Sequence, residues 1–226
     1  MSWTDLESLR TINRLREEFN IEVFVETGAY KGTNAYVQSS IFKRVLTCEI
    51  VDEYIKIAKE KLKDKKNVKI YKKDSPKFLK YILKKTRDYI FVYLDAHFYN
   101  PELPKKDRFV VLKELKALKD CKNCIIAIHD FDNGEFGHIT YDKQSLNFGL
   151  LSKRLKNVNK DFHYYTNTEC DIIKSGTEIG LNDDEEMKST LDFVWSSPEK
   201  TKRGILYCVP KKLDLNKYKL REINGT

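Results

Sequence analysis

The chain has 226 residues, of which 41% are hydrophobic and 12% aromatic, which suits one sizeable globular domain and excludes a disordered chain. Its longest apolar runs fall far short of a membrane span, and because residues 1–19 are charged throughout, we expect no secretory signal there. The formal net charge is +8, and lysines are concentrated from Lys56 to Lys85. A basic surface attracts nucleic acid or anionic substrates, although lysines alternating with apolar residues are also typical of a solvated face. We expect a single domain over residues 1–226.

The five cysteines indicate a reducing compartment. They stand at scattered spacings, and three lie within or at the ends of expected strands, as buried free thiols do. We therefore predict a cytoplasmic protein. Cys121 and Cys124 form a Cys-x-x-Cys pair with no second pair at zinc-finger spacing, so neither a metal site nor a redox site is indicated there.

The first elements of the chain are an amphipathic helix and a strand that ends in a glycine turn. Residues 1–20 have apolar residues at every third or fourth position and predict a helix that covers an edge of a sheet. The strand expected at 21–25 leads through Gly28 and Gly32 into a helix from Asn34. A glycine turn lets the backbone approach a ligand closely, and the next helix offers free N–H groups, so this unit is either half of a nucleotide site or an ordinary strand-to-helix turn.

The next two strands also end in polar residues. The strand expected at 45–48 ends at Glu49, which follows Glu26 by 23 residues, and a carboxylate at that point can accept both ribose hydroxyls. The strand expected at 68–71 leads to Asp74, Ser75 and Pro76. Ser75 is a suitable cap for a helix that runs to about Lys85. Asp74 is then an accessory cap or a partner for an adenine amino group.

Two uniformly apolar strands follow, as expected for strands buried on both faces. The first, at 89–94, ends at Asp95 and His97; after a helix around 107–119, the second, at 124–128, ends at His129 and Asp130. Because the carboxyl ends of parallel strands share one edge of a sheet, the polar groups at all five tips should meet in one crevice.

The remaining third of the chain completes the predicted sheet. A polar, aromatic loop at 132–144 should lie over the strand ends, and a helix is expected at 145–158. Residues 162–166 and 204–209 read as an antiparallel strand pair at the sheet edge, separated by an insertion or lid at 167–203. The predicted fold is therefore α/β, with a doubly wound, mostly parallel seven-stranded sheet and an antiparallel last strand.

The stretches "VETGAYKGT", "YLDAH" and "AIHDF", with Glu49 and Asp74, resemble the class I S-adenosylmethionine-dependent methyltransferases over roughly residues 20–166 and the last strand pair. The resemblance implies a Rossmann-like methyltransferase fold. It assigns the cofactor's methionine part to the turn, its ribose to Glu49, and its adenine to Asp74 with Ser75. The turn residues so implied, with the neighbouring strand tip, are Glu26, Thr27, Gly28, Tyr30, Gly32, Thr33 and Asp95. Tyr30 replaces the usual central glycine, which is closer to the "ETG" turn of macrocin-type O-methyltransferases.

Macrocin- and catechol-type enzymes also bind a divalent metal, and the resemblance places such a site at Asp95, His129 and Asp130. Carboxylate oxygens suit Mg²⁺, whereas the imidazole of His129 is a softer ligand that suits Mn²⁺, Fe²⁺ or Zn²⁺. Alternatively, His129 acts as a general base without metal, or His97 is the base or a further ligand. The candidate catalytic residues are thus Asp95, His97, His129 and Asp130.

The function that this resemblance implies is O-methylation of a saccharide or small-molecule hydroxyl, and whether a metal assists stays open. Tyr99, Phe131, Phe136, Tyr141 and Gln144 are candidate substrate-side residues on loops above the sheet. One alternative is a nucleic-acid or nucleotide methyltransferase that uses the basic surface. Residues 94–97 read Leu-Asp-Ala-His and lack the Asn/Asp-Pro-Pro-Tyr/Phe tetrad frequent in amino-directed enzymes. A non-catalytic, cofactor-binding partner protein is the second alternative, and the oligomeric state stays open.

Overall fold

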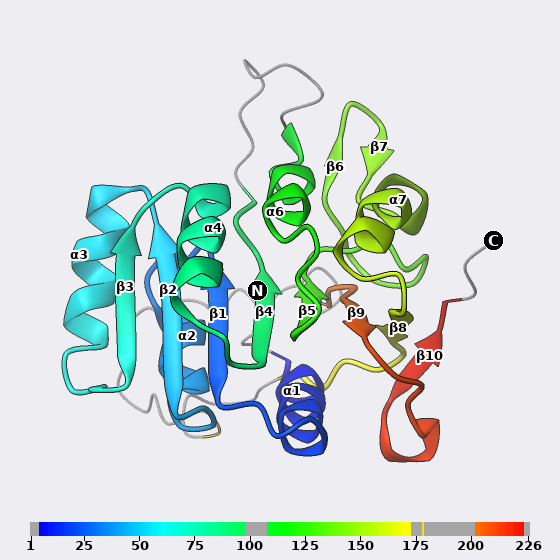
Figure 1. Ribbon diagram of the computed structural model, residues 1–226, viewed down its shortest axis with the longest axis horizontal. Coiled ribbons are helices and arrows are strands. Elements are labelled where there is room, and N and C mark those ends of the chain that lie inside the picture. Colours follow the sequence, from blue (N-terminus) through cyan, green and yellow to red (C-terminus); the bar gives the residue numbers. More distant parts are fainter. Residues whose placement is uncertain (1–4, 98–107, 173–177, 179–201, 224–226) are drawn as a thin grey trace.

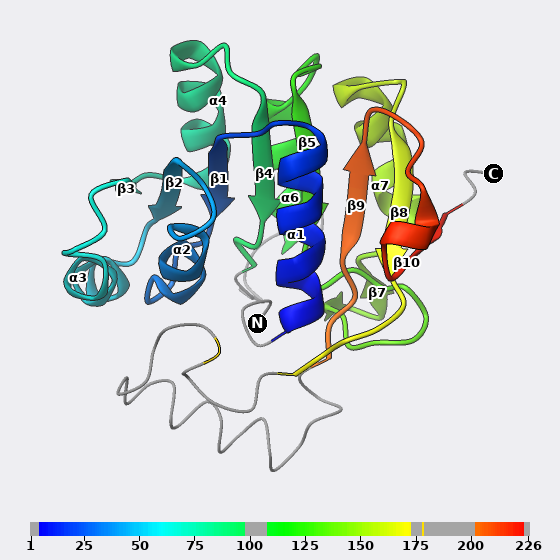
Figure 2. The same ribbon diagram turned by 90° about the horizontal axis from the view of Figure 1, so that it is seen from below.

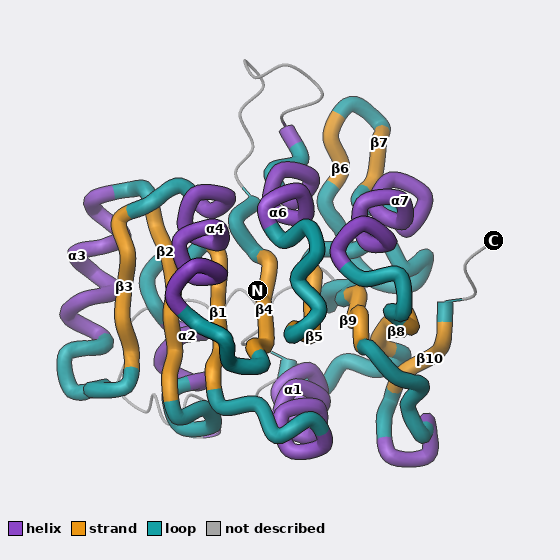
Figure 3. The backbone as a smooth tube through the Cα atoms, viewed as in Figure 1, coloured by secondary structure: helices purple, strands orange, loops and turns teal. Residues whose placement is uncertain are grey.

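The computed structural model describes residues 5–97, 108–172, 178 and 202–223. Its centre is an eight-stranded sheet in the order β10-β8-β9-β5-β4-β1-β2-β3, beside a two-stranded hairpin (Figure 1). The strands of the sheet are β1 (Val23–Thr27), β2 (Arg44–Glu49), β3 (Val68–Lys72), β4 (Ile90–Leu94), β5 (Cys124–Ile128), β8 (His163–Asn167), β9 (Leu206–Val209) and β10 (Leu220–Glu222). The hairpin pairs β6 (Thr140–Tyr141) with β7 (Gln144–Ser145) (Figure 3).

The sheet is parallel over its five strands from β3 to β5. β9 then runs antiparallel to both β5 and β8, and β10 runs antiparallel to β8. The predicted α/β fold with a mostly parallel sheet is confirmed. The predicted number of seven strands is wrong by one, because β10 has only three residues and just one of them, Leu220, is buried, which is too short for a periodic signal.

Helices cover both faces of the sheet (Figures 1 and 2). One apolar cluster joins the sheet to α1 (Leu6–Glu18), α2 (Thr33–Gln38) and α3 (Asp52–Lys61). A second cluster, on the other face, joins it to α4 (Ser75–Lys85), α6 (Val111–Ala117) and α7 (Phe148–Val158). A short 3₁₀ helix, η3 (Leu215–Lys217), precedes β10. The two clusters explain why the central strands are apolar on both faces.

The N-terminal helix lies elsewhere than predicted. α1 crosses the middle of the sheet over β4, β5 and β9 instead of covering an edge (Figure 2). Its Ile12 and Leu15 are buried in the same cluster as Phe91 and Tyr207 of the central strands. An amphipathic pattern shows that a helix buries one face, but it does not show which part of the sheet receives that face.

Two predicted helix starts are also corrected. Asp74, not Ser75, caps α4: its carboxylate accepts from the Lys77 amide at 3.4 Å, and Ser75 is the first helical residue. α7 begins at Phe148 because Asn147 caps it by accepting from the Leu150 amide. Aspartate, asparagine and serine are all good caps, so neighbouring candidates cannot be ranked by residue type alone.

Within the part of the chain that the structure describes, no helix is both long enough and apolar enough to span a bilayer. The expected insertion at 167–203 lies mainly outside the described residues. Strand order reverses beside β1, since the chain passes from β1 outward through β2 and β3 and then returns to β4 on the other side. The carboxyl ends of β1 and β4 therefore flank the crevice where open α/β sheets bind ligands.

Candidate functional site

The glycine turn after β1 is pressed against the ends of two neighbouring strands. The amides of Gly28 and Ala29 both donate to the Cys48 carbonyl, at 3.1 and 2.9 Å. Gly28 has φ +81°, and a Cβ there would stand 2.6 Å from the Asp95 carbonyl oxygen. Only glycine suits both this conformation and this approach. The turn therefore lies directly beside the tip of β4.

Glu49 at the end of β2 is held by backbone amides. One carboxylate oxygen accepts from Ile50 and Val51 at 2.6 and 3.0 Å, and the other accepts from Tyr30 at 2.9 Å. An ionised carboxylate has about four acceptor positions, so roughly one stays available on the oxygen that faces the turn. The Tyr30 side chain is 46% exposed, and its ring contacts the Tyr54 ring edge-on at 4.5 Å between centroids. Tyr30 thus supplies Glu49 with an amide and leaves its ring at the surface.

Glu26 lies beneath the turn instead of lining its surface. Its side chain is 1% exposed, and its two oxygens accept from Asn34 Nδ2 and Thr47 Oγ1, both at 2.6 Å. Burial, opposed by these hydrogen bonds, raises the pKa of Glu26 to about 7. Glu26 therefore ties together β1, β2 and α2.

The two threonines of the turn are buried as well. The Thr27 hydroxyl accepts from the Asp95 amide at 3.3 Å, and the Thr33 hydroxyl accepts from Lys61 Nζ at 2.8 Å. Gly32, with φ +84°, is the N-cap of α2, and a Cβ there would approach Ala58 of α3 to 3.0 Å. These residues shape the turn from below. Thr27, Gly32 and Thr33 were predicted to bind the cofactor, and in this structure they could do so only by fixing the backbone of the turn.

Three polar side chains converge where β4 and β5 end. Asp95 Oδ1 lies 3.0 Å from His129 Nδ1, and Asp130 Oδ1 lies 3.5 Å from the same nitrogen. One potential ligand atom from each residue falls within 4.8 Å of the others, as a metal site requires. We call these three residues the triad. Asp130 has φ +57°, a backbone conformation that non-glycine residues rarely adopt and that is concentrated at functional sites.

Electrostatics couple the three groups of the triad. Burial alone would lower the pKa of His129, but the carboxylates of Asp130 and Asp95 outweigh it and raise that pKa. Burial raises the pKa of Asp130, yet the positive charge on His129 prevails and holds it well below its usual value. The buried Asp130 Oδ1 accepts no hydrogen bond from a described residue, although Arg203 Nε lies 3.0 Å away as an ion partner.

His97 stands beside the triad with a defined tautomer. Its Nε2 lies 3.0 Å from the His129 carbonyl oxygen, which can only accept. Nε2 therefore carries the proton, and in the neutral ring the lone pair is on Nδ1. This is the arrangement that a general base needs.

The other predicted site residues are less directly placed. Asp74 is exposed at the start of α4, whereas Ser75 is buried beside it. Phe131 and Tyr141, predicted on the substrate side, are buried in the core. The Tyr141 ring packs on the Phe109 ring, with 4.8 Å between their centroids. Gln144 is exposed on β7 and Phe136 is partly buried, while Tyr99 lies outside the described residues.

Two residues near the site were not predicted as members of it. Arg203 precedes β9, and its Nε lies 3.0 Å from Asp130 Oδ1, a pairing that its place in the sequence does not indicate. Glu114 is fully buried on α6, close to Thr27 and Ser75, and burial raises its pKa despite these two hydroxyls. A signal for it exists: Glu114 stands three residues after Val111 and four before Leu118, on the apolar side of a helix. Burying a carboxyl group costs free energy unless it is hydrogen bonded, so Glu114 stands out on this side of the helix.

Comparisons with known proteins find similarity of fold only. No protein-family model matches the chain, and no curated protein matches its sequence. The fold resembles an rRNA methylase from Streptococcus thermophilus, with a TM-score of 0.51 and 10% identity over 88% of this chain and 94% of that one. It also resembles the methyltransferase domain of the bacterial CtHen1-CN, with a TM-score of 0.51 and 11% identity over 90% and 97% of the two chains. The chain therefore has the Rossmann-like α/β fold found in methyltransferase structures.

Proposed function

We propose that this protein is an S-adenosylmethionine-dependent methyltransferase that acts on the hydroxyl of a saccharide or small molecule, with a divalent metal bound by the triad. One observation carries the proposal. Two differently built polar sites, the turn with Glu49 and the triad, lie at the same edge of the sheet, and Asp95 follows the strand between them. Transfer between two substrates requires two such adjacent sites. The fold, shared with methyltransferases of known structure, supports it.

The residues at the turn fit the cofactor. Glu49, oriented by three amides, has an acceptor position for a ribose hydroxyl, and the backbone at Gly28 and Ala29 is close to strand β4 with no side chain at Gly28 to intervene. The cofactor supplies a methyl group on a sulfonium. The chain's own contribution is to fix the position of Glu49 and of the turn relative to Asp95.

The triad fits a first-row divalent cation. Its donor set is one imidazole nitrogen and two carboxylate oxygens, which suits Mn²⁺ better than Mg²⁺. Asp130 Oδ1 is buried, accepts no hydrogen bond from a described residue and has Arg203 Nε 3.0 Å away as an ion partner, and a cation would satisfy this oxygen. A metal there would lower the pKa of a bound hydroxyl. Because Nδ1 of His129 faces Asp95 Oδ1 at 3.0 Å and carries the proton in this pair, a cation on Nδ1 has to displace that proton.

His97 is the residue that we assign to the hydroxyl proton. Its Nε2 is anchored on the His129 carbonyl, so Nδ1 is the nitrogen that can accept a proton. The competing assignment, His129 as the base, is less suitable because that ring is buried between two carboxylates. We therefore place His97 as the base and His129 as a metal ligand.

Calorimetry with S-adenosylhomocysteine and with MnCl₂ or MgCl₂ tests the proposal. We expect the protein to bind S-adenosylhomocysteine, and Mn²⁺ more tightly than Mg²⁺. Asp130→Asn should weaken Mn²⁺ binding at least tenfold, whereas Asp132→Asn, two residues further along, should not. If S-adenosylhomocysteine does not bind under any condition, the proposal of a methyltransferase is contradicted, and so is the alternative of a non-catalytic cofactor-binding protein. Equal effects of the two variants would contradict the metal site.

A second candidate is a methyltransferase whose acceptor is carried on a nucleic acid. The observation that favours it is the clustering of positive charge at one edge of the sheet, and one protein of similar fold is named an rRNA methylase. Transfer of a radiolabelled methyl group to RNA, but not to saccharides offered at the same concentration, would select this candidate over the first.

A further inference from the structure

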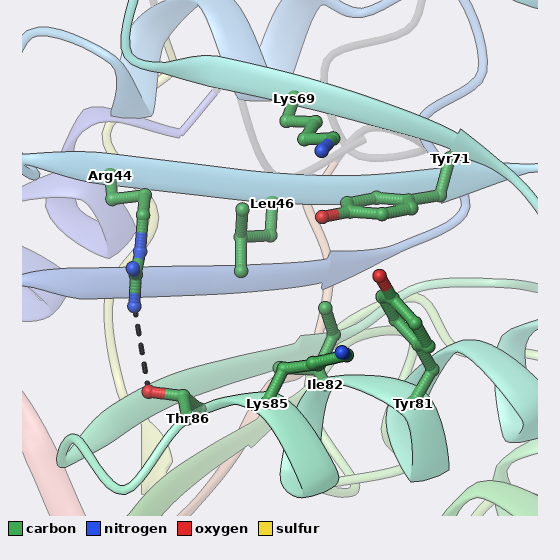
Figure 4. A pocket seen from close by; sticks show the side chains of 8 residues that line it. All are labelled: Arg44, Leu46, Lys69, Tyr71, Tyr81, Ile82, Lys85 and Thr86. Atoms are coloured by element: carbon green, nitrogen blue, oxygen red, sulfur yellow. Dashed lines mark hydrogen bonds between the residues drawn. The ribbon is translucent and has the colours of Figure 1, made fainter.

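A hollow of about 350 Å³ lies beside β3, the edge strand of the sheet (Figure 4). Leu46 and Ile82, both buried, are its apolar part, and the other side chains that line it are basic or bear a hydroxyl. The full lining comprises Arg44, Leu46, Lys69, Tyr71, Tyr81, Ile82, Lys85 and Thr86. We call this feature the edge hollow. None of these residues belongs to the turn or the triad.

The edge hollow exists because helix α4 leaves part of β3 uncovered. Val68 and Ile70 of β3 pack into the cluster that contains α3, so Lys69 and Tyr71 alternate onto the opposite face. On that face α4 packs mainly against α6 and β2, and Lys69 stays exposed while Tyr71 is partly buried. The hollow is therefore the space between β3 and α4, open at the edge of the sheet.

Three basic residues, Arg44, Lys69 and Lys85, line the edge hollow. Neither Lys69 nor Lys85 forms an ion pair with any carboxylate in the described part of the chain, and Arg44 pairs with the exposed Asp88 at 2.7 Å. Residues 56–87 contain fourteen lysines and arginines against three acidic residues, a net +11, whereas the whole chain carries +8. The remainder of the chain is thus slightly acidic, and the excess of positive charge comes from the segment that includes most of α3, together with β3 and α4.

Two tyrosine rings stand among these cations. The Tyr71 and Tyr81 rings are 5.7 Å apart between centroids, and the Tyr81 hydroxyl points toward the Tyr71 ring (Figure 4). Tyr81 is 37% exposed, with the ammonium groups of Lys73 and Lys85 within 5.6 and 5.9 Å of its centroid. Lys69 stands 5.2 Å from the Tyr71 centroid. Exposed rings next to cations are what proteins use to bind single strands, since bases stack on the rings and phosphates meet the cations.

We propose that the edge hollow binds single-stranded nucleic acid, with Arg44, Lys69 and Lys85 at phosphates and Tyr81 against a base. Lysines on an edge strand also prevent strand addition, but that explains Lys69 alone and not the residues contributed by β2 and α4. An anionic membrane is a poorer match, because the apolar residues lie inside the hollow and do not protrude.

The edge hollow extends toward the proposed active site. Tyr71 is in register with Cys48, one residue before Glu49, whereas Arg44 begins β2 about 17 Å from Glu49 at 3.3 Å per residue. A strand bound from Arg44 to Tyr71 would therefore point to the strand tips without occupying them. Binding there does not depend on methyl transfer, so it is measured without cofactor.

Fluorescence anisotropy with a labelled 12-nucleotide single-stranded RNA of mixed sequence tests the inference at about 50 and 200 mM NaCl. We expect Lys69→Gln/Lys85→Gln to weaken binding roughly tenfold or more and to reduce the salt slope by about 1.4. Tyr81→Leu should weaken binding at least fivefold, whereas Tyr81→Phe, which keeps the ring, should retain it. The matched control is Lys56→Gln/Lys59→Gln, which removes the same charge from α3 on the other face.

Three outcomes would overturn the inference: no RNA binding at 50 mM NaCl, equal weakening by the control pair, or indifference to Tyr81→Leu. Binding of phosphatidylserine vesicles that is lost in Lys69→Gln/Lys85→Gln, without RNA binding, would assign the hollow to a membrane surface instead. Calorimetry with S-adenosylhomocysteine on the same variants should be unchanged. Failure of the methyltransferase proposal would thus be seen separately from failure of this one.

Discussion

Replacing Glu26 by glutamine should remove a pH dependence of stability that burial of this carboxyl group creates. Both oxygens of Glu26 are hydrogen bonded inside the protein, to Asn34 and Thr47. Glutamine has the shape of the protonated side chain and can keep both contacts, because the Thr47 hydroxyl can accept as well as donate. The substitution therefore changes the ability to ionise with little change in packing.

The magnitude follows from the shift in the pKa of Glu26. The folded protein keeps the Glu26 proton up to about pH 7, whereas the unfolded chain releases it near 4.5. The folded state thus binds more protons between these values, so the stability that this group contributes is complete below the unfolded pKa and is lost as the pH rises through about 7. The free energy of unfolding should fall by about 2 to 3 kcal/mol from pH 5 to pH 8 through this group.

Urea unfolding followed by circular dichroism at pH 5, 6, 7 and 8 measures the effect. The free energy of unfolding of the wild type, minus that of Glu26→Gln, should decrease by about 2 to 3 kcal/mol over this range. Glu53→Gln, at the exposed start of α3, controls for loss of a carboxylate elsewhere. Parallel pH curves for the wild type and Glu26→Gln would refute the reasoning, since they would show that Glu26 ionises alike in the folded and unfolded states.

Three further predictions concern the turn and the triad. Gly28→Ala should lower the free energy of unfolding, measured with urea, by about 2 kcal/mol or more, because its Cβ would meet the Asp95 carbonyl. The control is Gly134→Ala, which has a similar φ of +82° but open space around its Cβ, and which should lower the free energy of unfolding by about 1 kcal/mol. Mn²⁺ binding measured by calorimetry should strengthen as the pH rises from 6 to 8, because the raised pKa of His129 keeps a proton in the metal's position at lower pH; a flat profile would argue against His129 as a ligand. Glu49→Gln should weaken S-adenosylhomocysteine binding about tenfold and leave Mn²⁺ binding unchanged. Weaker Mn²⁺ binding with unchanged S-adenosylhomocysteine binding would contradict the assignment of Glu49 to the cofactor.

The fold was predictable because its signals are local and repeated. Each parallel strand is a short apolar run, and the strand expected at 124–128 coincides with β5. The glycine turn was predictable because two glycines after an apolar run are a local signal, and Gly28 and Gly32 both adopt positive φ in the structure. β10 and the place of α1 were not, because a three-residue strand has no period and an amphipathic helix does not specify which part of the sheet it covers.

The partners within the site were less predictable than its location. Sequence placed Asp95, His129 and Asp130 at neighbouring strand tips, and the structure brings them within 4.8 Å. It could not place Arg203 at Asp130, because these residues are 73 positions apart and meet only through the antiparallel β9. Phe131 and Tyr141, predicted on the substrate side, are buried, since an aromatic residue in a loop is often there to fill the core below.

Acidic residues that stood equivalently at strand tips in the sequence take different roles because they meet different hydrogen-bond donors. Glu26 meets two side-chain donors in a sealed space, and its raised pKa makes it a structural group. Glu49 meets three backbone amides at the surface of the turn, which fixes its direction while leaving an acceptor position. Asp130 meets an imidazole and an arginine, which hold it charged. Position along the sheet therefore predicts where a ligand binds, and only the neighbours of each carboxylate decide which of them can contact it.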